Sequence, residues 1–244
     1  MLTQPLETLR KMIEESENIV FFGGAGVSTE SGIPDFRSRD GLYAMKYAYP
    51  PEEILSHDFL EENPEEFFRF YRDKILDPGM NAKPNAAHKR LAELEQRGKL
   101  TAVVTQNIDG LHDDAGNKNV LELHGSVRRN YCAKCGMRYA LSDVLSSTGV
   151  PHCACGGIIR PDVVLYGEPL DPDVIEASVS AIASADMLMI AGTSLAVYPA
   201  AGLIRYFRGN RLVLINKSST PMDGSADLVL HEKVGEVLDA VCGR

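Results

Sequence analysis

The sequence lacks several features that would point to other classes of protein. Its 244 residues contain no tryptophan. No apolar run reaches the roughly 20 residues that a membrane-spanning helix needs. The first ten residues include Glu7 and no apolar stretch, so we expect no secretion signal. Basic residues are outnumbered, because 25 Lys and Arg face 34 Asp and Glu and leave a formal charge of -9. We therefore expect neither direct nucleic-acid binding nor membrane binding.

Cysteine is scarce, but it is clustered. Four of the five cysteines form two pairs, Cys132-x-x-Cys135 and Cys153-x-Cys155. Clustered cysteines without a secretion signal favour a metal site over disulfides, and four thiolates suit tetrahedral zinc. Because four protein ligands leave no open position for water, we expect Zn²⁺ to be structural here. Two alternatives are four reduced cysteines without metal and His152 replacing one cysteine. This cysteine usage indicates a cytoplasmic protein.

Continuous apolar runs alternate with helical patterns along the chain. The expected strands are residues 19–22, 102–105, 120–123, 163–166, 188–191, 212–215 and 228–230. The expected helices are residues 6–16, 171–185, 233–242 and a segment between an N-cap at Asn85 and a stop at Gly98. Such an alternation predicts an α/β fold with a doubly wound, parallel, Rossmann-like sheet, covered by helices on both faces.

Two segments interrupt this alternation. Residues 38–76 show no strong strand pattern but contain aromatic residues and a helical stretch after Pro64. Residues 127–160 contain the four clustered cysteines. We predict that 38–76 forms a loop and helical insertion, that 127–160 forms a zinc ribbon, and that both build a smaller domain. Residues 1–37, 77–126 and 161–244 would then form the discontinuous Rossmann-like domain.

A glycine-rich turn follows the first expected strand. In Gly24-Ala25-Gly26-Val27-Ser28-Thr29, the glycines would let the backbone approach a dinucleotide pyrophosphate, and the next helix would offer free amides to the phosphates. Thr29 stands where the G-x-G-x-x-G pattern has its third glycine. Taken alone, the turn is equally consistent with a plain strand-to-helix connection.

Polar side chains follow two other expected strands. Gln106, Asn107 and Asp109 come just after residues 102–105, and His124 comes just after residues 120–123. Ligands of open α/β sheets bind outside the carboxyl ends of the strands, so these groups should converge on one pocket. Structural alternatives stay open, since Asp109 could cap a short helix, Asn107 could stabilise a turn and a lone histidine such as His124 is usually structural.

Taken together, the motifs resemble those of the sirtuin family. The glycine turn continues into Ser31-Gly32-Ile33-Pro34-Asp35-Phe36-Arg37. The other sirtuin motifs follow in order, as Thr105-Gln106-Asn107-Ile108-Asp109, Leu123-His124-Gly125, the paired cysteines, Tyr166-Gly167-Glu168, Gly192-Thr193-Ser194-Leu195 and Asn216-Lys217. The resemblance covers residues 19–234. It implies an enzyme that consumes NAD as co-substrate, removes acetyl groups from lysines of proteins or peptides, and releases nicotinamide and O-acetyl-ADP-ribose.

The resemblance also implies a role for individual residues. His124 would be the general base on a ribose hydroxyl, and Asn107 would position the ribose and a water. Histidine suits this task because its unperturbed pKa of ~6.5 lies near neutral pH. The implied cofactor-binding residues are Gly24, Ala25, Gly26, Thr29, Asp35, Phe36, Arg37, Gln106, Asn107, Ile108, Asp109, His124, Gly192, Thr193, Ser194, Asn216, Lys217 and Val234.

Substrate choice is implied by a short helical stretch. Phe68 and Tyr71 match the positions at which desuccinylating relatives carry Tyr-x-x-Arg, while Arg72 lies one residue later, about 100° around a helix. Since an acyl carboxylate would lack a partner, we predict a deacetylase that is weak on succinyl groups. The substrate backbone should pair with a strand whose matching residues are Val163, Tyr166, Gly167 and Glu168.

Two other functions compete with the deacetylase. One is a mono-ADP-ribosyltransferase, which would leave ADP-ribose on a protein side chain. The other is a non-enzymatic module in which the zinc ribbon binds partners. Because the pattern shows no stripe of exposed apolar residues, we expect a monomer.

Overall fold

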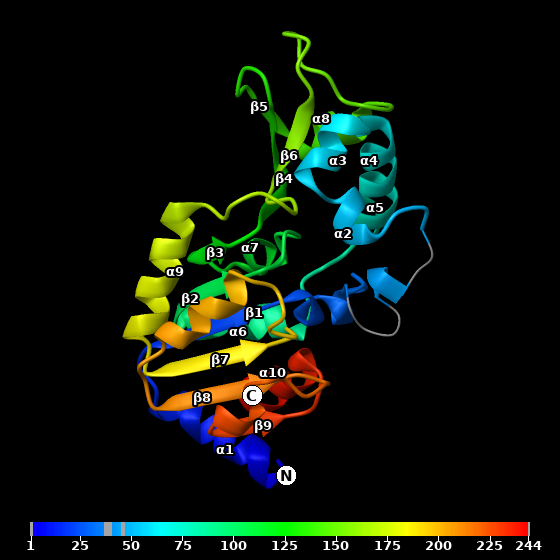
Figure 1. The fold of residues 1–244 in the computed structure, drawn as a ribbon. Coiled ribbons are helices and arrows are strands. Elements are labelled where there is room, and N and C mark those ends of the chain that lie inside the picture. The colour runs from blue at the N-terminus through cyan, green and yellow to red at the C-terminus, as the bar shows by residue number, and fades with distance from the viewer. Residues whose placement is uncertain (1, 37–40, 45–46, 244) are drawn as a thin grey trace.

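A six-stranded parallel sheet forms the larger lobe of the computed structural model, which describes residues 2–36, 41–44 and 47–243 (Figure 1). Its strand order is β3-β2-β1-β7-β8-β9, and every neighbouring pair is parallel. The strands are β1 (Ile19–Gly23), β2 (Leu100–Thr105), β3 (Val120–Glu122), β7 (Met187–Ala191), β8 (Arg211–Ile215) and β9 (Leu228–Leu230). This is the doubly wound order, and it confirms the predicted Rossmann-like sheet.

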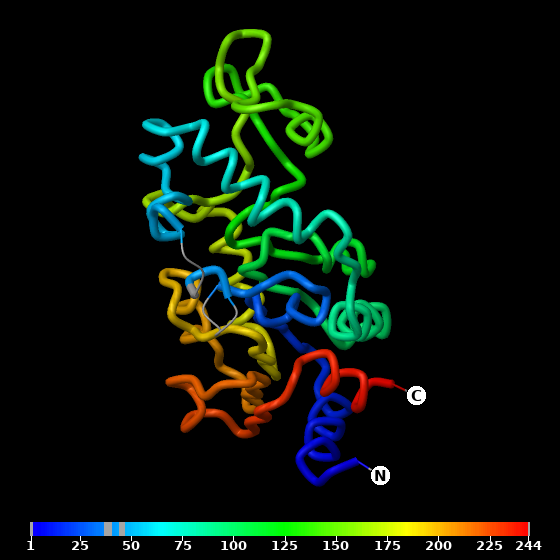
Figure 2. Tube along the Cα trace, turned by 90° about the vertical axis from the view of Figure 1, so that its right-hand side faces the viewer, coloured from blue at the N-terminus to red at the C-terminus, as the bar shows by residue number. Residues whose placement is uncertain are grey.

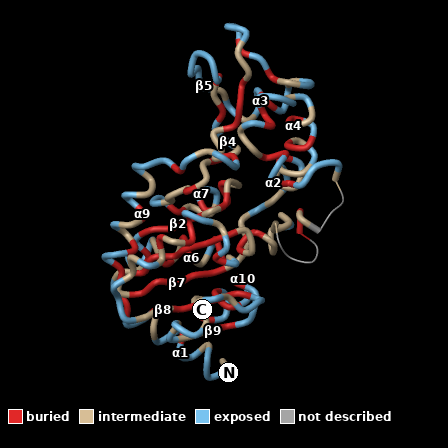
Figure 3. The backbone as a smooth tube through the Cα atoms, in the orientation of Figure 1, coloured by how far each residue is buried: buried red, intermediate tan, exposed pale blue. Residues whose placement is uncertain are grey.

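Helices cover both faces of this sheet. On one face, α1 (Gln4–Glu15), α6 (Ala86–Gln96) and α10 (Val234–Cys242) pack against strand residues such as Phe21. On the other face lie α9 (Pro172–Ser184) and the 3₁₀ helix η5 (Ala200–Tyr206). The central strands are therefore buried on both sides, as Figure 3 shows, and this explains their continuous apolar sequences.

The helix α6 begins and ends as its sequence predicts. The side-chain carbonyl of Asn85 accepts a hydrogen bond from Ala87 N at 2.9 Å, and its amide donates to Val27 O at 2.8 Å. Gly98, just past the helix, has a φ of 71°, which an L side chain rarely adopts. One side chain thus caps α6 and also fixes the chain that follows the glycine turn.

The smaller lobe combines a second sheet with a group of short helices. The antiparallel sheet has the order β5-β4-β6, with β4 (Gly125–Cys132), β5 (Arg138–Ala140) and β6 (Ile159–Val163). The helical elements are α2 (Pro51–Ile54), α3 (His57–Glu62), α4 (Pro64–Phe70), the π-helical η4 (Tyr71–Leu76), α5 (Asp77–Met80) and α8 (Leu141–Ser146). Figure 2 shows the two interruptions of the alternating pattern stacked above the main sheet.

These two interruptions share one hydrophobic core. Phe67 and Phe68 from α4 pack in the same buried cluster as Cys132, Val144 and Ile159 from the cysteine-bearing segment. A joint smaller domain was predicted, and the common core is consistent with it. The precise domain boundaries stay a prediction.

One strand prediction was wrong. Residues 163–166 do not form a strand of the parallel sheet, because β6 ends at Val163 and pairs antiparallel with β4. The chain then runs extended between the lobes, with Tyr166 N donating to Leu55 O at 3.0 Å. Val164 packs against a core of the larger lobe and Leu165 is buried in that of the smaller lobe. The run is apolar because it passes between two cores.

The connection after β1 also differs from the expectation. The glycine turn leads into two 3₁₀ turns, η1 (Ala25–Val27) and η2 (Thr29–Ser31), and not into an α-helix. Ile33 precedes Pro34, which disfavours a helical conformation there. The helix that packs behind this region is α6, and it follows the helical insertion in the chain. Among the described residues, no helix is both long and apolar enough to cross a bilayer.

Candidate active site

A cavity of about 1240 Å³ lies between the lobes, at the carboxyl ends of the central strands. The strand order reverses between β1 and β7, and a crevice at such a point is the usual ligand site of an open α/β sheet. Arg37 lies outside the described residues. All the other predicted cofactor-binding residues line this cavity, namely Gly24, Ala25, Gly26, Thr29, Asp35, Phe36, Gln106, Asn107, Ile108, Asp109, His124, Gly192, Thr193, Ser194, Asn216, Lys217 and Val234.

Glycines let the loops after β1 and β7 come into direct contact. A Cβ at Gly24 would lie 2.8 Å from Thr193 Cβ, and one at Gly26 would lie 2.7 Å from Gly192 Cα. Gly192 has a φ of 60°, and a Cβ there would lie 2.4 Å from Val27 N. The two loops therefore form a bare backbone cradle, as the approach of a pyrophosphate requires.

Thr29 helps to shape this cradle. Its hydroxyl donates to Gly26 O at 3.0 Å and so stabilises the 3₁₀ turn. A side chain is tolerated at the position of the third glycine because no α-helix follows β1. The departure from G-x-G-x-x-G therefore reflects a different local backbone.

Ser28 joins two of the predicted polar residues. Its hydroxyl donates to Asp109 Oδ2 at 2.7 Å and accepts from Asn107 Nδ2 at 3.0 Å. The other carboxylate oxygen of Asp109 accepts from Leu111 N at 2.9 Å, at the start of α7 (Leu111–Ala115). Asp109 thus holds the first amide of α7 from the residue before its N-cap Gly110, and it also lines the cavity. Ser28 was missed as a site residue, although it belongs to the glycine motif.

A backbone carbonyl determines the tautomer of His124. His124 Nδ1 lies 2.9 Å from Gln106 O, and a carbonyl oxygen can only accept a hydrogen bond. In the neutral ring Nδ1 therefore carries the proton, and Nε2 has a free lone pair. Burial lowers the pKa of His124 below its usual value, although the bond to Gln106 acts in the opposite direction. The ring is therefore neutral at pH 7, as a general base must be.

A second set of bonds fixes the loop after β7. The Asn216 side chain accepts from Thr193 N at 2.9 Å and donates to Thr193 O at 2.9 Å. Gln106 Nε2 donates to Thr193 Oγ1 at 3.1 Å. These bonds connect the ends of β2, β7 and β8. Each polar end of the Asn216 side chain thus holds one backbone group of Thr193, so Asn216 positions this loop.

The smaller lobe supplies the far wall of the cavity. Tyr71 lines the cavity, but Phe68 does not; it is fully buried behind it, with the two rings edge to face at 6.3 Å. Arg72 points elsewhere, as the helical spacing predicted. Its guanidinium donates to Gly149 O at 2.6 Å and to Ser147 Oγ at 3.0 Å.

Further wall residues of this lobe escaped the sequence analysis. Those in the two interruptions are Leu42, Leu55, Lys74, Ile75, Leu76, Val127, Arg128, Leu141 and Leu145, while Gly79 and Met80 follow directly after the first interruption. The only signal for them was the helical spacing that places Ile75 four residues after Tyr71. It could not show that the cysteine-bearing segment contributes to the same wall.

The segment predicted to pair with substrate also lines the cavity. Val163, Tyr166, Gly167 and Glu168 all lie in the wall. The Glu168 carboxylate accepts from Leu165 N at 2.8 Å, and its two oxygens lie 2.5 and 2.9 Å from the Arg160 guanidinium. Burial alone would raise the pKa of Glu168, but the bonds from Arg160 and Leu165 lower it. Glu168 is therefore ionised and anchors the turn.

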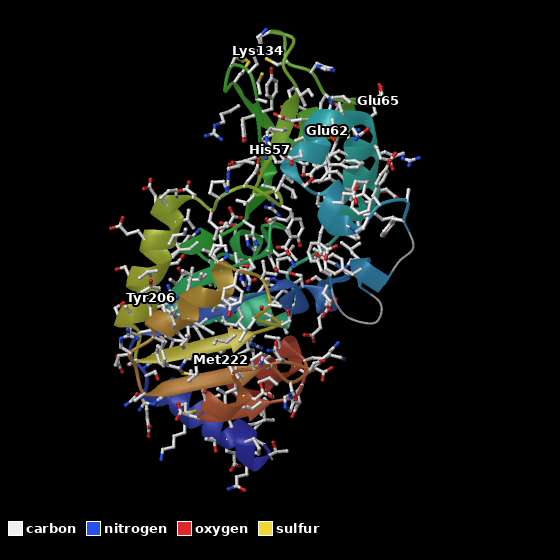
Figure 4. All side chains as sticks on the ribbon, viewed as in Figure 1. His57, Glu62, Glu65, Lys134, Tyr206 and Met222 are labelled. Atoms are coloured by element: carbon white, nitrogen blue, oxygen red, sulfur yellow. The ribbon has the colours of Figure 1, made fainter. Side chains whose placement is uncertain are left out.

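A third side chain contacts the ion pair between Arg160 and Glu168. His57 Nδ1 lies 2.9 Å from Glu168 Oε1, and Figure 4 shows His57 in the smaller lobe. His57 N also donates to Tyr166 O at 3.0 Å. The helical insertion thus holds the segment around Tyr166 and Glu168 through His57.

The four clustered cysteines converge at the distal end of the smaller lobe. The Sγ atoms of Cys132, Cys135, Cys153 and Cys155 all lie within 4.8 Å of one another. The Cys132–Cys155 and Cys135–Cys153 Sγ separations are 3.4 and 3.6 Å. Zinc with Zn–S bonds of about 2.3 Å places tetrahedral sulfurs about 3.8 Å apart. The donor set and spacing fit a structural zinc, remote from the cavity, since none of the four lines it.

These features define a dinucleotide-binding α/β protein with a zinc site. The glycine cradle and the cavity lie at the switch point of a Rossmann-like sheet, and the second lobe carries the four cysteines. The chain belongs to the Sir2 family, whose family model matches residues 24–199. The sirtuin resemblance is thereby confirmed.

Individual relatives agree over almost the whole chain. An NAD-dependent protein deacetylase of Clostridium acetobutylicum is 58% identical over 245 residues, covering 99% of each chain. One of Clostridium perfringens is 60% identical over 240 residues, covering 97% of this chain and 98% of that protein. A solved Sir2 structure with a deacetylated p53 peptide and 3′-O-acetyl ADP-ribose is 41% identical, with a TM-score of 0.89. It covers 97% of this chain and 96% of that one.

Proposed function

We propose that this chain is an NAD-dependent protein lysine deacetylase that releases nicotinamide and O-acetyl-ADP-ribose. The observation that carries the proposal is the His124 ring, which lines the cavity with its proton held on Nδ1 by Gln106 O at 2.9 Å. Nε2 is then available as a base beside the cradle that fits a dinucleotide. The curated relatives carry the same activity in their names, which supports the proposal.

NAD supplies the electrophilic anomeric carbon and the nicotinamide leaving group. The cradle of Gly24, Gly26 and Gly192 would receive the pyrophosphate. Asn107 and Asp109, oriented by Ser28, would hold the nicotinamide end. His124 Nε2 would take the proton of a ribose hydroxyl, whose oxygen then accepts the acetyl group.

The acyl range follows from the charges of the cavity wall. Arg72 is committed to Gly149 O and Ser147 Oγ, and Lys74 pairs with Asp73 at 2.8 Å. Arg128, the other cation that the smaller lobe contributes to the described wall, pairs with Asp114, while Lys217 lies among the predicted cofactor-binding residues. We therefore propose weak activity on succinyl-lysine. Rates on acetyl and succinyl versions of one peptide test this, and comparable kcat/KM values would overturn it.

Nicotinamide release is the direct test of the main proposal. NAD should be consumed only with an acetylated peptide, giving one nicotinamide and one O-acetyl-ADP-ribose per lysine freed. Nicotinamide release without peptide, with radiolabelled ADP-ribose appearing on a protein, would instead identify a mono-ADP-ribosyltransferase. Zinc binding without any nicotinamide release would favour a non-enzymatic module.

We also propose that the protein acts as a cytoplasmic monomer on acetylated proteins, without direct contact to nucleic acid or membrane. The net charge of -9 and the unbonded cysteine pairs support this. Sedimentation at micromolar concentration would reveal a dimer if one formed.

A further inference from the structure

Asn85 joins the glycine turn to a helix that lies much later in the chain. It is the N-cap of α6 and stands 58 residues after Val27. Its side-chain nitrogen donates to Val27 O at 2.8 Å and to Ser31 Oγ at 3.0 Å. Its side-chain oxygen accepts from Ala87 N at 2.9 Å. The oxygen is therefore engaged by α6, and the nitrogen is engaged by the segment of the glycine turn.

The bond to Val27 fixes one peptide plane of this turn. The carbonyl of Val27 and the amide of Ser28 belong to the same planar unit. Ser28 N donates to Ala25 O at 3.1 Å, so the plane is held at both ends, by the 3₁₀ turn and by Asn85. Because Val27 is fully buried, water does not compete for its carbonyl oxygen.

The held plane lies between the two functional parts of the turn. On one side, Gly26 forms the backbone cradle with Gly192, and Gly26 N donates to Gly192 O at 2.8 Å. On the other side, Ser28 carries the hydroxyl that orients the polar residues after β2. A rotation of this plane would displace both parts at once. Asn85 itself does not line the cavity.

We propose that Asn85 is a positioning residue for NAD, which acts through the glycine turn and does not touch the cofactor. This inference rests on the proposed deacetylase function, in which the cradle receives the pyrophosphate. The competing explanation is that Asn85 serves only as a helix cap. The two roles use different atoms, since the cap uses the side-chain oxygen and the support of the turn uses the nitrogen. A substitution can therefore remove one role and keep the other.

Two substitutions keep the cap and remove the amide donor. Asn85→Asp preserves the shape of the side chain, and Asn85→Ser preserves its neutrality. Asn, Asp and Ser are about equally good N-caps, so both variants should unfold at the same urea concentration as the wild type. Without the donor, the turn fits a pyrophosphate for only part of the time. The apparent Kd of NAD then rises in inverse proportion to that fraction.

The measured quantities are the Kd of NAD by calorimetry, and then kcat and the KM for NAD with an acetylated peptide. Kd and KM should rise about tenfold in both variants, because each leaves a buried acceptor without its hydrogen bond. At saturating NAD, kcat should stay within about twofold of the wild type, since bound NAD shifts the turn back to the fitting arrangement.

Asp171→Ser is the matched control. Asp171 caps α9 by accepting from Asp173 N at 2.8 Å, and it does not line the cavity. Its Kd for NAD should equal that of the wild type. An unchanged Kd in both Asn85 variants, or an equal rise in Asp171→Ser, would overturn the proposal. A rise confined to Asn85→Asp would also overturn it, because the added charge would then be the cause.

Further results separate this proposal from the function on which it rests. A wild-type chain that binds NAD but releases no nicotinamide with an acetyl-lysine peptide contradicts the deacetylase, while the Kd comparison still decides the role of Asn85. Normal wild-type turnover with an unchanged Kd in both variants contradicts only the role of Asn85. Failure of both variants to fold would assign Asn85 to the stability of the larger lobe and would overturn the proposal as well.

Discussion

The two lobes of the molecule are stabilised in different ways. The larger lobe buries continuous apolar strands between two layers of helices, as the hydrophobic effect alone would favour. The smaller lobe has short helices, a three-stranded sheet and four cysteines that converge at its end. The larger lobe carries the cradle and His124, whereas the smaller lobe supplies the acyl wall. The proposed cofactor chemistry thus lies on the lobe with the two apolar sheet cores, and the proposed substrate choice on the lobe that carries the four cysteines.

The largest expected effect is a loss of structure that is confined to the smaller lobe. Cys135→Ala should release the zinc, because only three of the four ligands of a closed tetrahedral site remain. Zinc binding at such sites contributes about 10–16 kcal/mol to folding in isolated peptides. Bound zinc should fall from one per chain to none. Amide exchange should accelerate in β4 and β6 while β1 and β7 stay protected, since their core lies in the other lobe.

Cys242→Ala provides the control for this variant. Cys242 packs against the larger core, so zinc content and the protection of β4 should stay as in the wild type. Full zinc occupancy in Cys135→Ala would contradict the assignment of the ligands.

The next effect concerns the chemistry of the larger lobe. His124→Ala should fold normally but lose at least ~100-fold in kcat, the usual contribution of a general base. In the wild type, kcat/KM should rise with pH as the ring loses its proton, with an inflection below 6.5, since burial lowers the pKa of His124.

His231→Ala is a matched control for His124→Ala. His231 Nδ1 likewise faces a backbone carbonyl, Asn216 O at 3.1 Å, but His231 does not line the cavity. Its turnover should be near normal. Near-normal turnover by His124→Ala would contradict the proposal that His124 is the general base.

A third change weakens the contact between the lobes. Glu168→Gln leaves the Arg160 guanidinium, 9% exposed, without its counter-ion. The loss of one partner of a buried pair costs about 3–5 kcal/mol, and partial exposure of Glu168 reduces this to about 2–3. Urea unfolding should show the loss, and KM for the peptide should rise. Glu66→Gln removes an equally short but exposed contact to Arg69 and should change neither.

The smallest effect concerns buried histidines in the larger lobe. Burial, aided by the nearby His88, lowers the pKa of His112 to about 3. As pH falls below ~6.5 the unfolded chain therefore binds a proton that the native chain does not, and stability falls by about 1.4 kcal/mol per pH unit for this residue. His112→Leu should show a shallower loss between pH 6.5 and pH 5 in urea unfolding. Parallel curves for both chains would contradict this.

Much of the larger lobe was predictable because its elements are periodic and locally capped. Asn85 and Gly98 mark the ends of α6 in the sequence, and apolar runs mark the strands. Ligands of open α/β sheets bind at the carboxyl ends of the strands. This regularity predicted that Gln106, Asn107, Asp109 and His124 lie in one pocket.

The rest depended on contacts between distant segments. The apolar run 163–166 resembles a buried strand, but its side chains divide between the cores of two lobes. Phe68 was placed in the acyl pocket, although it lies behind Tyr71, because spacing on one helix cannot show which residue a second segment covers. The role of Asn216 as a brace also depends on a loop 23 residues away.

The hydrogen-bond acceptor that orients His124 is one that few point mutations can remove. Many catalytic imidazoles are held by a carboxylate, and a single codon change can remove that group. Here the acceptor is the main-chain oxygen of Gln106, which every amino acid at that position would retain. Point mutation can therefore shift this oxygen only by moving the backbone. The contact that sets the tautomer of His124 therefore survives a change of side chain at position 106, whereas the bond between Ser28 and Asn107 is lost when either side chain is replaced.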